Sequence, residues 1–250
     1  MPNIRVLTWN AYGGSTANLA TAINSLNIDV TVLQETHNNG ASAFYNPLNA
    51  LGGYTVSGPF IENVTRQTPT GNNFHPDPSV RRSYAVVTRN ATVGAVAAAL
   101  VDYTTDGAYV IPNSAFNAGM QGFTYRPPLR VTFTHNGNAC VIYNWHAPLI
   151  HQNARGIQLF DGCNALANDV AGGNLVIIGA DMNNNALSAN RFAAFDGLAD
   201  GYDHLLAANT VGANPVVDLR TLAGVTAVQI GYLNALYAAP HWAVPARISY

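Results

Sequence analysis

The polar residues of this chain can be arranged around one stretch, Asn174-Leu-Val-Ile-Ile-Gly-Ala-Asp-Met-Asn-Asn-Asn185. Residues 175–178 form a short apolar run with a β-branched majority, bounded by glycines, and this predicts a strand buried on both faces. Asp181 and three asparagines follow directly. A charge at the end of a buried strand is costly to desolvate unless it is paired, and strand ends in α/β sheets are where sites are built. The alternative is that Asp181 caps a helix beginning near Ala186, with the asparagines as turn formers.

The composition describes a globular, weakly charged protein. The chain has 250 residues, 48% of them hydrophobic and 10% charged, with a net charge of −2. No repeat or linker interrupts it, so we expect one domain over residues 1–250. The net charge exerts no long-range pull on a polyanion. A nucleic-acid substrate would therefore have to be held by a local arginine cluster and a metal.

All eleven cationic residues are arginine, and the chain contains no lysine. Arginine binds phosphate in a bidentate manner. A chain without lysine also offers no ubiquitin attachment site, which would suit a toxin acting in a host cytosol. Drift in an unusual genome explains the composition equally well.

Cys140 and Cys163 are too few for a disulfide scaffold and lack metal-site spacing, so we expect buried thiols. No signal peptide and no apolar run of about 20 residues is visible. The chain is then either cytosolic or a mature form whose leader lies outside this sequence.

Polar residues recur where the expected strands end. A strand at residues 4–9 leads to Asn10, a helix follows at 17–26, and a strand at 30–33 leads to Glu35. This β-loop-helix-β order predicts a parallel pair with a right-handed crossover. Further along, the pattern predicts helices at 41–51, 152–171 and 187–198, strands at 83–88, 95–101, 225–232 and 241–248, a hairpin turning at 135–138 between strands 129–134 and 139–145, and loops at 67–78 and 109–123.

The strand-end residues include carboxylates, two histidines and amide donors. A phosphoester hydrolase needs a carboxylate for a divalent metal, a histidine to move a proton and donors for the phosphoryl oxygens. Oxygen ligands suit Mg²⁺ or Mn²⁺, and the sequence has no cysteine–histidine cluster of the kind that closed zinc sites use. The residues that fit are Asn10, Glu35, His146, Asp181, Asn183 and His241.

Each of these residues lies in one of six short motifs that resemble those of the endonuclease/exonuclease/phosphatase superfamily, in family order. The motifs are Leu7-Thr-Trp-Asn10, Leu33-Gln-Glu35, Tyr125-Arg-Pro-Pro-Leu129, Asn144-Trp-His-Ala147, Gly179-Ala-Asp-Met-Asn183 and Pro240-His-Trp242. The resemblance implies a deoxyribonuclease-like, four-layer α/β sandwich with two central mixed sheets flanked by helices.

The resemblance also implies a role for each matching residue. Glu35 would bind the metal with Asn10 beside it. His146 and His241 would be the histidine pair at the scissile phosphate, and Asp181 would orient or activate water. Arg126 would contact phosphate and Asn183 a phosphoryl oxygen. The other histidines match no motif and are expected on the surface or in loops: His37, His75, His135, His151 and His204.

Three departures from the family pattern stand out. The usual Ser-Asp-His is Ala239-Pro-His241, so Pro240 replaces a metal-binding Asp and offers neither a ligand nor an N–H. The carboxylate that orients the last histidine is expected at Asp218, with Asp203 as the second choice. The carboxylate that partners the first histidine would fall near Arg82 and is expected to be absent.

Within this superfamily the chain most resembles the B subunits of cytolethal distending toxins. Three features favour that comparison: the absent carboxylate, the basic pair Arg81-Arg82 and the lack of lysine. The resemblance implies a secreted nuclease with delivery subunits, acting inside a target cell. The first hypothesis is therefore a metal-dependent DNA phosphodiesterase. A phosphoinositide phosphatase of the same fold and a degenerate, non-catalytic binding subunit remain as alternatives.

Overall fold

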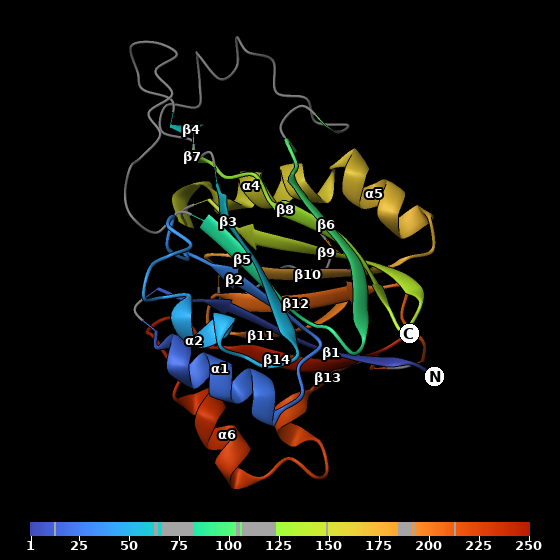
Figure 1. The fold of residues 1–250 in the computed structure, drawn as a ribbon. Coiled ribbons are helices and arrows are strands. Elements are labelled where there is room, and N and C mark those ends of the chain that lie inside the picture. Colours follow the sequence, from blue (N-terminus) through green and yellow to red (C-terminus); the bar gives the residue numbers. More distant parts are fainter. Residues whose placement is uncertain are drawn as a thin grey trace.

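Two six-stranded mixed sheets packed face to face form the centre of the molecule (Figure 1). The computed structural model describes residues 1–12, 14–62, 65–66, 83–103, 106, 124–148, 150–184, 192, 194–212 and 214–250. The first sheet has the order β13 (Val216–Asp218), β14 (Val244–Ser249), β1 (Asn3–Asn10), β2 (Val30–Gln34), β5 (Ser83–Arg89), β3 (Tyr54–Ile61). The second has the order β11 (Asp196–Asp200), β12 (Asp203–Ala208), β10 (Leu175–Asp181), β9 (Asn138–His146), β8 (Leu129–His135), β6 (Val93–Leu100). A separate small ladder pairs β4 (Thr65–Arg66) with β7 (Thr124–Tyr125).

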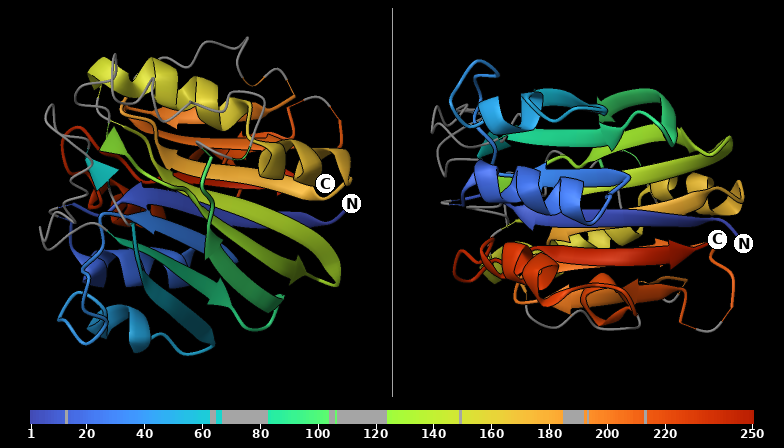
Figure 2. Two further views of the ribbon diagram at one scale, coloured as in Figure 1. Left: turned by 90° about the horizontal axis from the view of Figure 1, so that it is seen from above. Right: turned by 60° about the horizontal axis from the view of Figure 1, so that its bottom comes forward.

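Helices cover the outer face of each sheet, as the two views of Figure 2 show. The first sheet carries α1 (Thr16–Ser25), α2 (Asn46–Asn49) and α6 (Ala227–Asn234), and its strand β13 continues into the 3₁₀ turn η1 (Leu219–Thr221). The second sheet carries α4 (Ile150–Asp161) and α5 (Asn164–Ala171). One apolar core lies between the sheets and one lies under each set of helices. The four-layer α/β sandwich expected from the sequence is confirmed.

The sheets approach closely where β1 and β2 face β10. A Cβ placed on Gly179 would lie 2.4 Å from Cγ2 of Val32 and 3.1 Å from Cβ of Thr8, so the position has no room for a side chain. Nearby, Nε2 of Gln34 donates to Oδ1 of Asn144 at 2.7 Å, and Nδ2 of Asn144 donates to the Leu33 carbonyl at 3.0 Å. Because these amides are buried, the bonds between them fix how the two sheets align.

The opening β-loop-helix-β unit is confirmed, since β1 and β2 are parallel, and so is the hairpin of β8 and β9. Other predictions were wrong in detail. The helix predicted at 152–171 is two helices separated at Gly162-Cys163, and the one at 41–51 shrinks to α2. The strand predicted at 225–232 is α6, which begins at a capping box of Thr226 and Gln229.

The C-terminal third also departs from the sequence reading. Residues 196–198 of the helix predicted at 187–198 belong to β11, and most of the remainder lies outside the described residues. The last strand begins at Val244 rather than at residue 241. The loops predicted at 67–78 and 109–123, and the pair Arg81-Arg82, also lie outside the described residues.

Cys140 and Cys163 are buried free thiols, as expected. Burial raises the pKa of each thiol to about 11, so neither is a reactive thiolate at neutral pH. Among the described residues, no helix is long and apolar enough to cross a bilayer.

Candidate active site

Strand register places three of the site residues side by side. In the second sheet, Asp181 at the end of β10 is the ladder partner of His146 on β9 and of Asp203 on β12. The first sheet contributes Asn10, the last residue of β1, whose Nδ2 donates to Oδ2 of Asp181 at 2.8 Å. The ends of strands from both sheets therefore meet at one rim of the sandwich.

Asp181 is the centre of this rim and is 1% exposed. Its Oδ1 accepts the backbone N–H of Asn183 at 2.8 Å, while Oδ2 accepts from Asn10. The same Oδ2 lies 3.5 Å from Nε2 of His146 and 3.8 Å from Nδ1 of His241. The two histidines expected to act together therefore both face one buried carboxylate.

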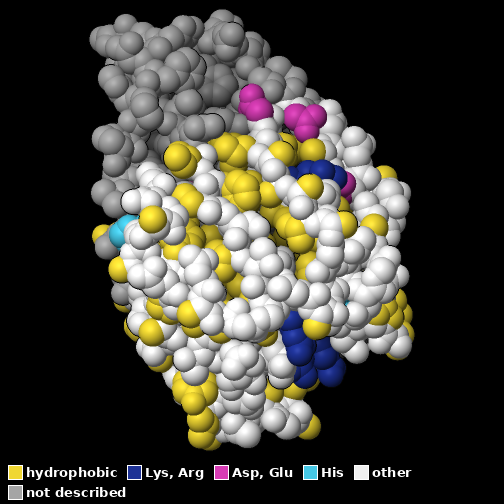
Figure 3. Space-filling model, in the orientation of Figure 1, with side chains coloured by type: hydrophobic (Ala, Val, Ile, Leu, Met, Phe, Trp, Pro, Cys, Tyr) yellow, Lys and Arg dark blue, Asp and Glu magenta, His cyan; other side chains and the backbone are white. Residues whose placement is uncertain are grey.

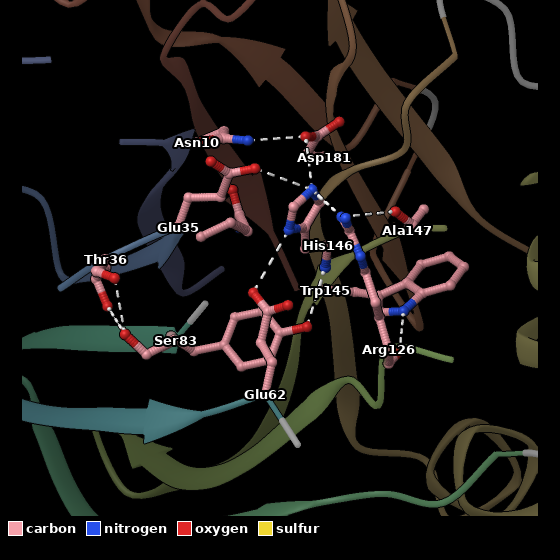
Figure 4. Close-up of polar contacts among 12 residues, drawn as sticks. Asn10, Glu35, Thr36, Glu62, Ser83, Arg126, Trp145, His146, Ala147 and Asp181 are labelled. Carbon is pink, nitrogen blue, oxygen red and sulfur yellow. Dashed lines mark hydrogen bonds and ion pairs between the residues drawn. The ribbon is translucent and has the colours of Figure 1, made fainter. Parts of the chain in front are cut away.

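His146 is surrounded by charged groups, as Figure 4 shows. Oε1 of Glu35 lies 3.3 Å from Nε2, and Oε1 of Glu62 lies 3.4 Å from Nδ1. A guanidinium nitrogen of Arg126 contacts Nε2 and also donates to the Ala147 carbonyl at 3.3 Å. The imidazole is thus held between an acidic and a basic side chain at Nε2, with a second carboxylate behind it.

Glu62 is a site residue that the sequence analysis missed. The expectation that the first histidine lacks a carboxylate partner is wrong, because Glu62 supplies one from the residue after β3. Its side chain is fully buried, and among the described residues neither oxygen has a hydrogen-bond partner and the His146 ring is the counter-group that lies against it. A buried carboxylate there favours a proton on Nδ1 of His146.

His241 is paired with Asp203, and the first choice of Asp218 was wrong. Nδ1 of His241 lies 3.0 Å from Oδ2 of Asp203, whose Oδ1 accepts the backbone N–H of Asn10 at 3.0 Å. Asp218 instead accepts the backbone N–H and Nε of Arg220, at 2.9 and 3.0 Å, and caps η1. A carboxylate committed to a neighbouring guanidinium is not the partner of the histidine.

Burial raises the pKa of Asp203 far above its usual range, and the nearby Asp181 charge adds to this effect. Burial lowers the pKa of His241, but the hydrogen bond to Asp203 and the charges of Asp181, Asp203 and Glu35 outweigh it, so the net pKa is raised. The Asp203–His241 pair therefore retains protons to a higher pH than the separate groups would.

Two side chains at the rim depart from ordinary strand geometry or pairing. Glu35 has a φ of 50°, a left-handed conformation that is uncommon for glutamate and is often found at functional sites. Arg126 is 4% exposed, and its Nε has no hydrogen-bond partner in the part of the chain that the structure describes. An oxyanion at this rim would satisfy that donor.

The rim suits a divalent metal held by few protein ligands. The described residues contain no cluster of three or more His, Cys, Asp and Glu arranged for a metal ion. Glu35 offers a partly exposed carboxylate, and Oδ1 of Asn10 accepts the Tyr12 backbone N–H at 3.0 Å, which leaves one lone pair. Mg²⁺ commonly takes one or two carboxylates together with water and substrate phosphate, so Glu35 and Asn10 fit it. Pro240, in place of the usual aspartate, adds no ligand.

Two of the remaining histidines are buried, contrary to expectation. His135 is 1% exposed and contacts the Tyr250 hydroxyl, and His204 is 2% exposed and contacts the Asn184 carbonyl at 2.7 Å. Burial lowers the pKa of His204 and favours its neutral form. His37 is partly exposed, whereas His75 and the His151 side chain lie outside the described residues.

Comparison with known proteins connects this geometry to a family. The sequence pattern of the Endonuclease/Exonuclease/phosphatase family matches residues 7–239. No curated protein sequence matches the chain. Among solved structures, the human Nocturnin catalytic domain with bound sulfate anion has a TM-score of 0.59 at 14% identity, with 100% of this chain and 95% of that chain covered.

Two forms of D. rerio TDP2 are also similar in fold. A version humanized by 14 mutations has a TM-score of 0.56 at 12% identity and covers 99% of both chains. The complex with a single strand DNA product has a TM-score of 0.57 at 11% identity and covers 100% of both chains. At these identities the likeness concerns the fold alone.

Proposed function

Because the chain belongs to the endonuclease/exonuclease/phosphatase family, we propose that it is a divalent-metal-dependent phosphodiesterase that cleaves DNA. Family members are typically metal-dependent phosphoesterases or nucleases. One observation carries the proposal: the Nδ1 atoms of His146 and His241 each face a buried carboxylate, and both rings lie beside Asp181.

The histidine pair suits proton transfer at a phosphodiester. Hydrolysis requires one proton to leave the attacking water and another to reach the leaving oxygen. With Asp203 at Nδ1, Nε2 is the nitrogen that His241 presents to substrate. Nε2 of His146 faces Glu35, Arg126 and Asp181, the groups proposed to hold the metal, the phosphate and the water. Asp181 is held by Asn10 and Asn183 and provides a fixed acceptor for water.

Arg126 and a metal would manage the negative charge of the phosphate. The unpartnered Nε of Arg126 is a donor for a phosphoryl oxygen. When bound by Glu35 and Asn10, Mg²⁺ would supply electrostatic stabilisation of the phosphate charge. The toxin-like role, with delivery subunits and entry into a target cell, rests on the motif resemblance and the lysine-free composition alone.

An aromatic pair beside the site favours nucleic acid over a lipid headgroup. Tyr237 and Trp242 have ring centroids 4.6 Å apart, and Tyr237 is 49% exposed. Trp242 directly follows His241, and exposed aromatic rings next to a phosphate site stack on bases. The fold neighbour D. rerio TDP2, whose structure contains a single strand DNA product, supports the same choice.

The decisive experiment is nicking of supercoiled plasmid with and without EDTA. We expect Mg²⁺-dependent nicking that EDTA abolishes. Phosphate release from a phosphoinositide without nicking would identify the phosphatase instead. Absence of turnover on either substrate would identify a non-catalytic binding subunit.

Glu35→Gln tests the metal role in the same assay. The variant should need more Mg²⁺ for its half-maximal rate and should lose the increase in Tm that Mg²⁺ gives the wild type, because one anionic ligand is lost. Asp196→Asn, a neutralised carboxylate on β11, is the matched control and should respond to Mg²⁺ as the wild type does. An unchanged Mg²⁺ response in Glu35→Gln removes this residue from the metal site.

A further inference from the structure

A second polar pocket lies at the end of the sandwich opposite to the candidate active site. It has a volume of about 540 Å³, and its lining includes Arg5, Arg89, Arg247, His135 and Asp29. Arg5 precedes Asn10 by five residues on β1, so the pocket lies roughly 16 Å along the strand from the rim of Asp181. Figure 1 shows both chain termini at this end. The pocket is therefore separate from the catalytic residues.

The pocket gathers positive charge on a protein that carries little of it. Three of the chain's eleven arginines line the pocket, and Asp29 is the one carboxylate among the described residues of the lining. Figure 3 shows arginine side chains (dark blue) gathered in the region where Figure 1 labels β1 and β13. A net positive pocket on a chain with a net charge of −2 attracts anions locally.

Asp29 offsets the charge of at most one of the three arginines, and both of its oxygens already accept a hydrogen bond from a neutral donor. Oδ2 accepts the Arg5 backbone N–H at 2.8 Å, and Oδ1 accepts the Thr92 hydroxyl at 2.7 Å. Nη1 of Arg89 lies 4.0 Å from Oδ1, at the limit of an ion pair. Within the described part of the chain, the guanidinium groups of Arg5 and Arg247 have no carboxylate partner.

Arg5 and Arg247 are held against each other by strand register. They are direct partners in the antiparallel ladder of β1 and β14, where like charges opposite each other are destabilising. Nη1 of Arg5 donates to the Leu26 carbonyl at 2.7 Å, whereas Nε of Arg247 is buried and has no hydrogen-bond partner among the described residues. A bound oxyanion would relieve the repulsion and satisfy this donor at once.

We propose that this pocket binds a phosphate group through Arg5, Arg89 and Arg247. Planar guanidinium groups match the oxygens of phosphate in a bidentate manner. The three asparagines and Thr92 that complete the lining add neutral hydrogen-bonding groups. The volume exceeds what a bare ion fills and falls in the range of small-molecule sites, so the phosphate belongs either to a small phosphorylated molecule or to a nucleic-acid backbone.

The test is calorimetric titration of inorganic phosphate into the protein in EDTA, at constant ionic strength. Because the candidate active site would also take phosphate, the titration uses the Arg126→Gln background. Adding Arg247→Gln there should weaken phosphate binding about tenfold, because charge-assisted hydrogen bonds are lost. The matched control is Arg130→Gln, which removes an arginine of the second sheet that pairs with Asp169 of α5. This control should leave the Kd for phosphate unchanged.

Arg5→Gln provides a second variant and should weaken phosphate binding in the same way. Oligonucleotide affinity then identifies the source of the phosphate. If Arg247→Gln also weakens oligonucleotide binding, the pocket takes backbone phosphates, and if it does not, it takes a free phosphorylated molecule. The proposal is overturned if neither Arg247→Gln nor Arg5→Gln changes the phosphate affinity of the Arg126→Gln protein. At saturating plasmid, the kcat of nicking by Arg247→Gln alone should match the wild type, because the pocket lies away from the catalytic residues, so failure here is distinct from failure of the proposed function.

Discussion

At the scale of single residues, the common neighbour of His146 and His241 determines how their effects should combine. Both rings lie within 4 Å of Oδ2 of Asp181. If they act as one unit, His146→Ala and His241→Ala should each lower the nicking rate on the order of a hundredfold or more. The double variant should be little slower than either single one, because residues of a catalytic unit are not additive. If the fold-loss in kcat of the double variant equals the product of the two single fold-losses, the histidines have independent roles.

Asp203 and Asp218 make a matched pair of substitutions. Asp203→Asn keeps the size of the side chain but removes the charge that positions Nδ1 of His241, so kcat should fall on the order of a hundredfold with a small change in KM. Asp218→Asn should leave kcat within about threefold and lower the Tm instead, because Asp218 pairs with Arg220 and caps η1. Equal effects of both substitutions on kcat would remove Asp203 as the positioning residue.

At the scale of elements, the close approach of the two sheets depends on Gly179 in β10. A methyl group there would overlap Val32 and press on Thr8, so Gly179→Ala should lower the free energy of unfolding by about 1–3 kcal/mol. Gly231→Ala in α6 is the control, since no atom of the described residues lies within 4 Å of its added Cβ and alanine favours a helix by about 1 kcal/mol over glycine. Urea unfolding should show opposite signs for the two variants. If Gly179→Ala left the free energy of unfolding unchanged, the two sheets could move apart at this position without a loss of stability.

Strands buried on both faces were the elements that the sequence predicted best. The apolar runs of β1, β2, β9 and β10 end in polar residues, and those residues meet at one rim because parallel neighbours end together. Glu62 was missed because β3, with its Gly58-Pro59 step and half-exposed side chains, carries no clear strand pattern. The strand β12 was missed as well, and Asp203 begins it. The partner of His241 therefore could not be chosen by local pattern, since register across the sheet decides it.

At the scale of the whole molecule, Asp29 connects the two sheets at the end away from the candidate active site. Its carboxylate accepts from the backbone of Arg5 in the first sheet and from Thr92 in the turn into the second. Nε2 of His135, at the end of β8, lies 3.6 Å from Oδ2. Arg89 also faces this carboxylate. Loss of the charge on Asp29 should therefore lower the free energy of unfolding of the whole domain rather than change only the local structure.

The pH dependence of that stability follows from the pKa of Asp29. Burial raises this pKa, but hydrogen bonds from His135, Arg5 and Thr92 outweigh burial and hold it below the usual 3.8. A depressed carboxyl pKa contributes stability that is present above the unfolded-state pKa and is lost as the pH falls through the folded-state pKa. Asp29→Asn should thus be less stable than the wild type by about 1–3 kcal/mol near neutral pH, and the difference should shrink on acidification below about pH 4. Urea unfolding of both proteins across that range measures the difference. A stability difference that stays constant down to the lowest pH would mean that the charge of Asp29 contributes nothing to the connection between the sheets.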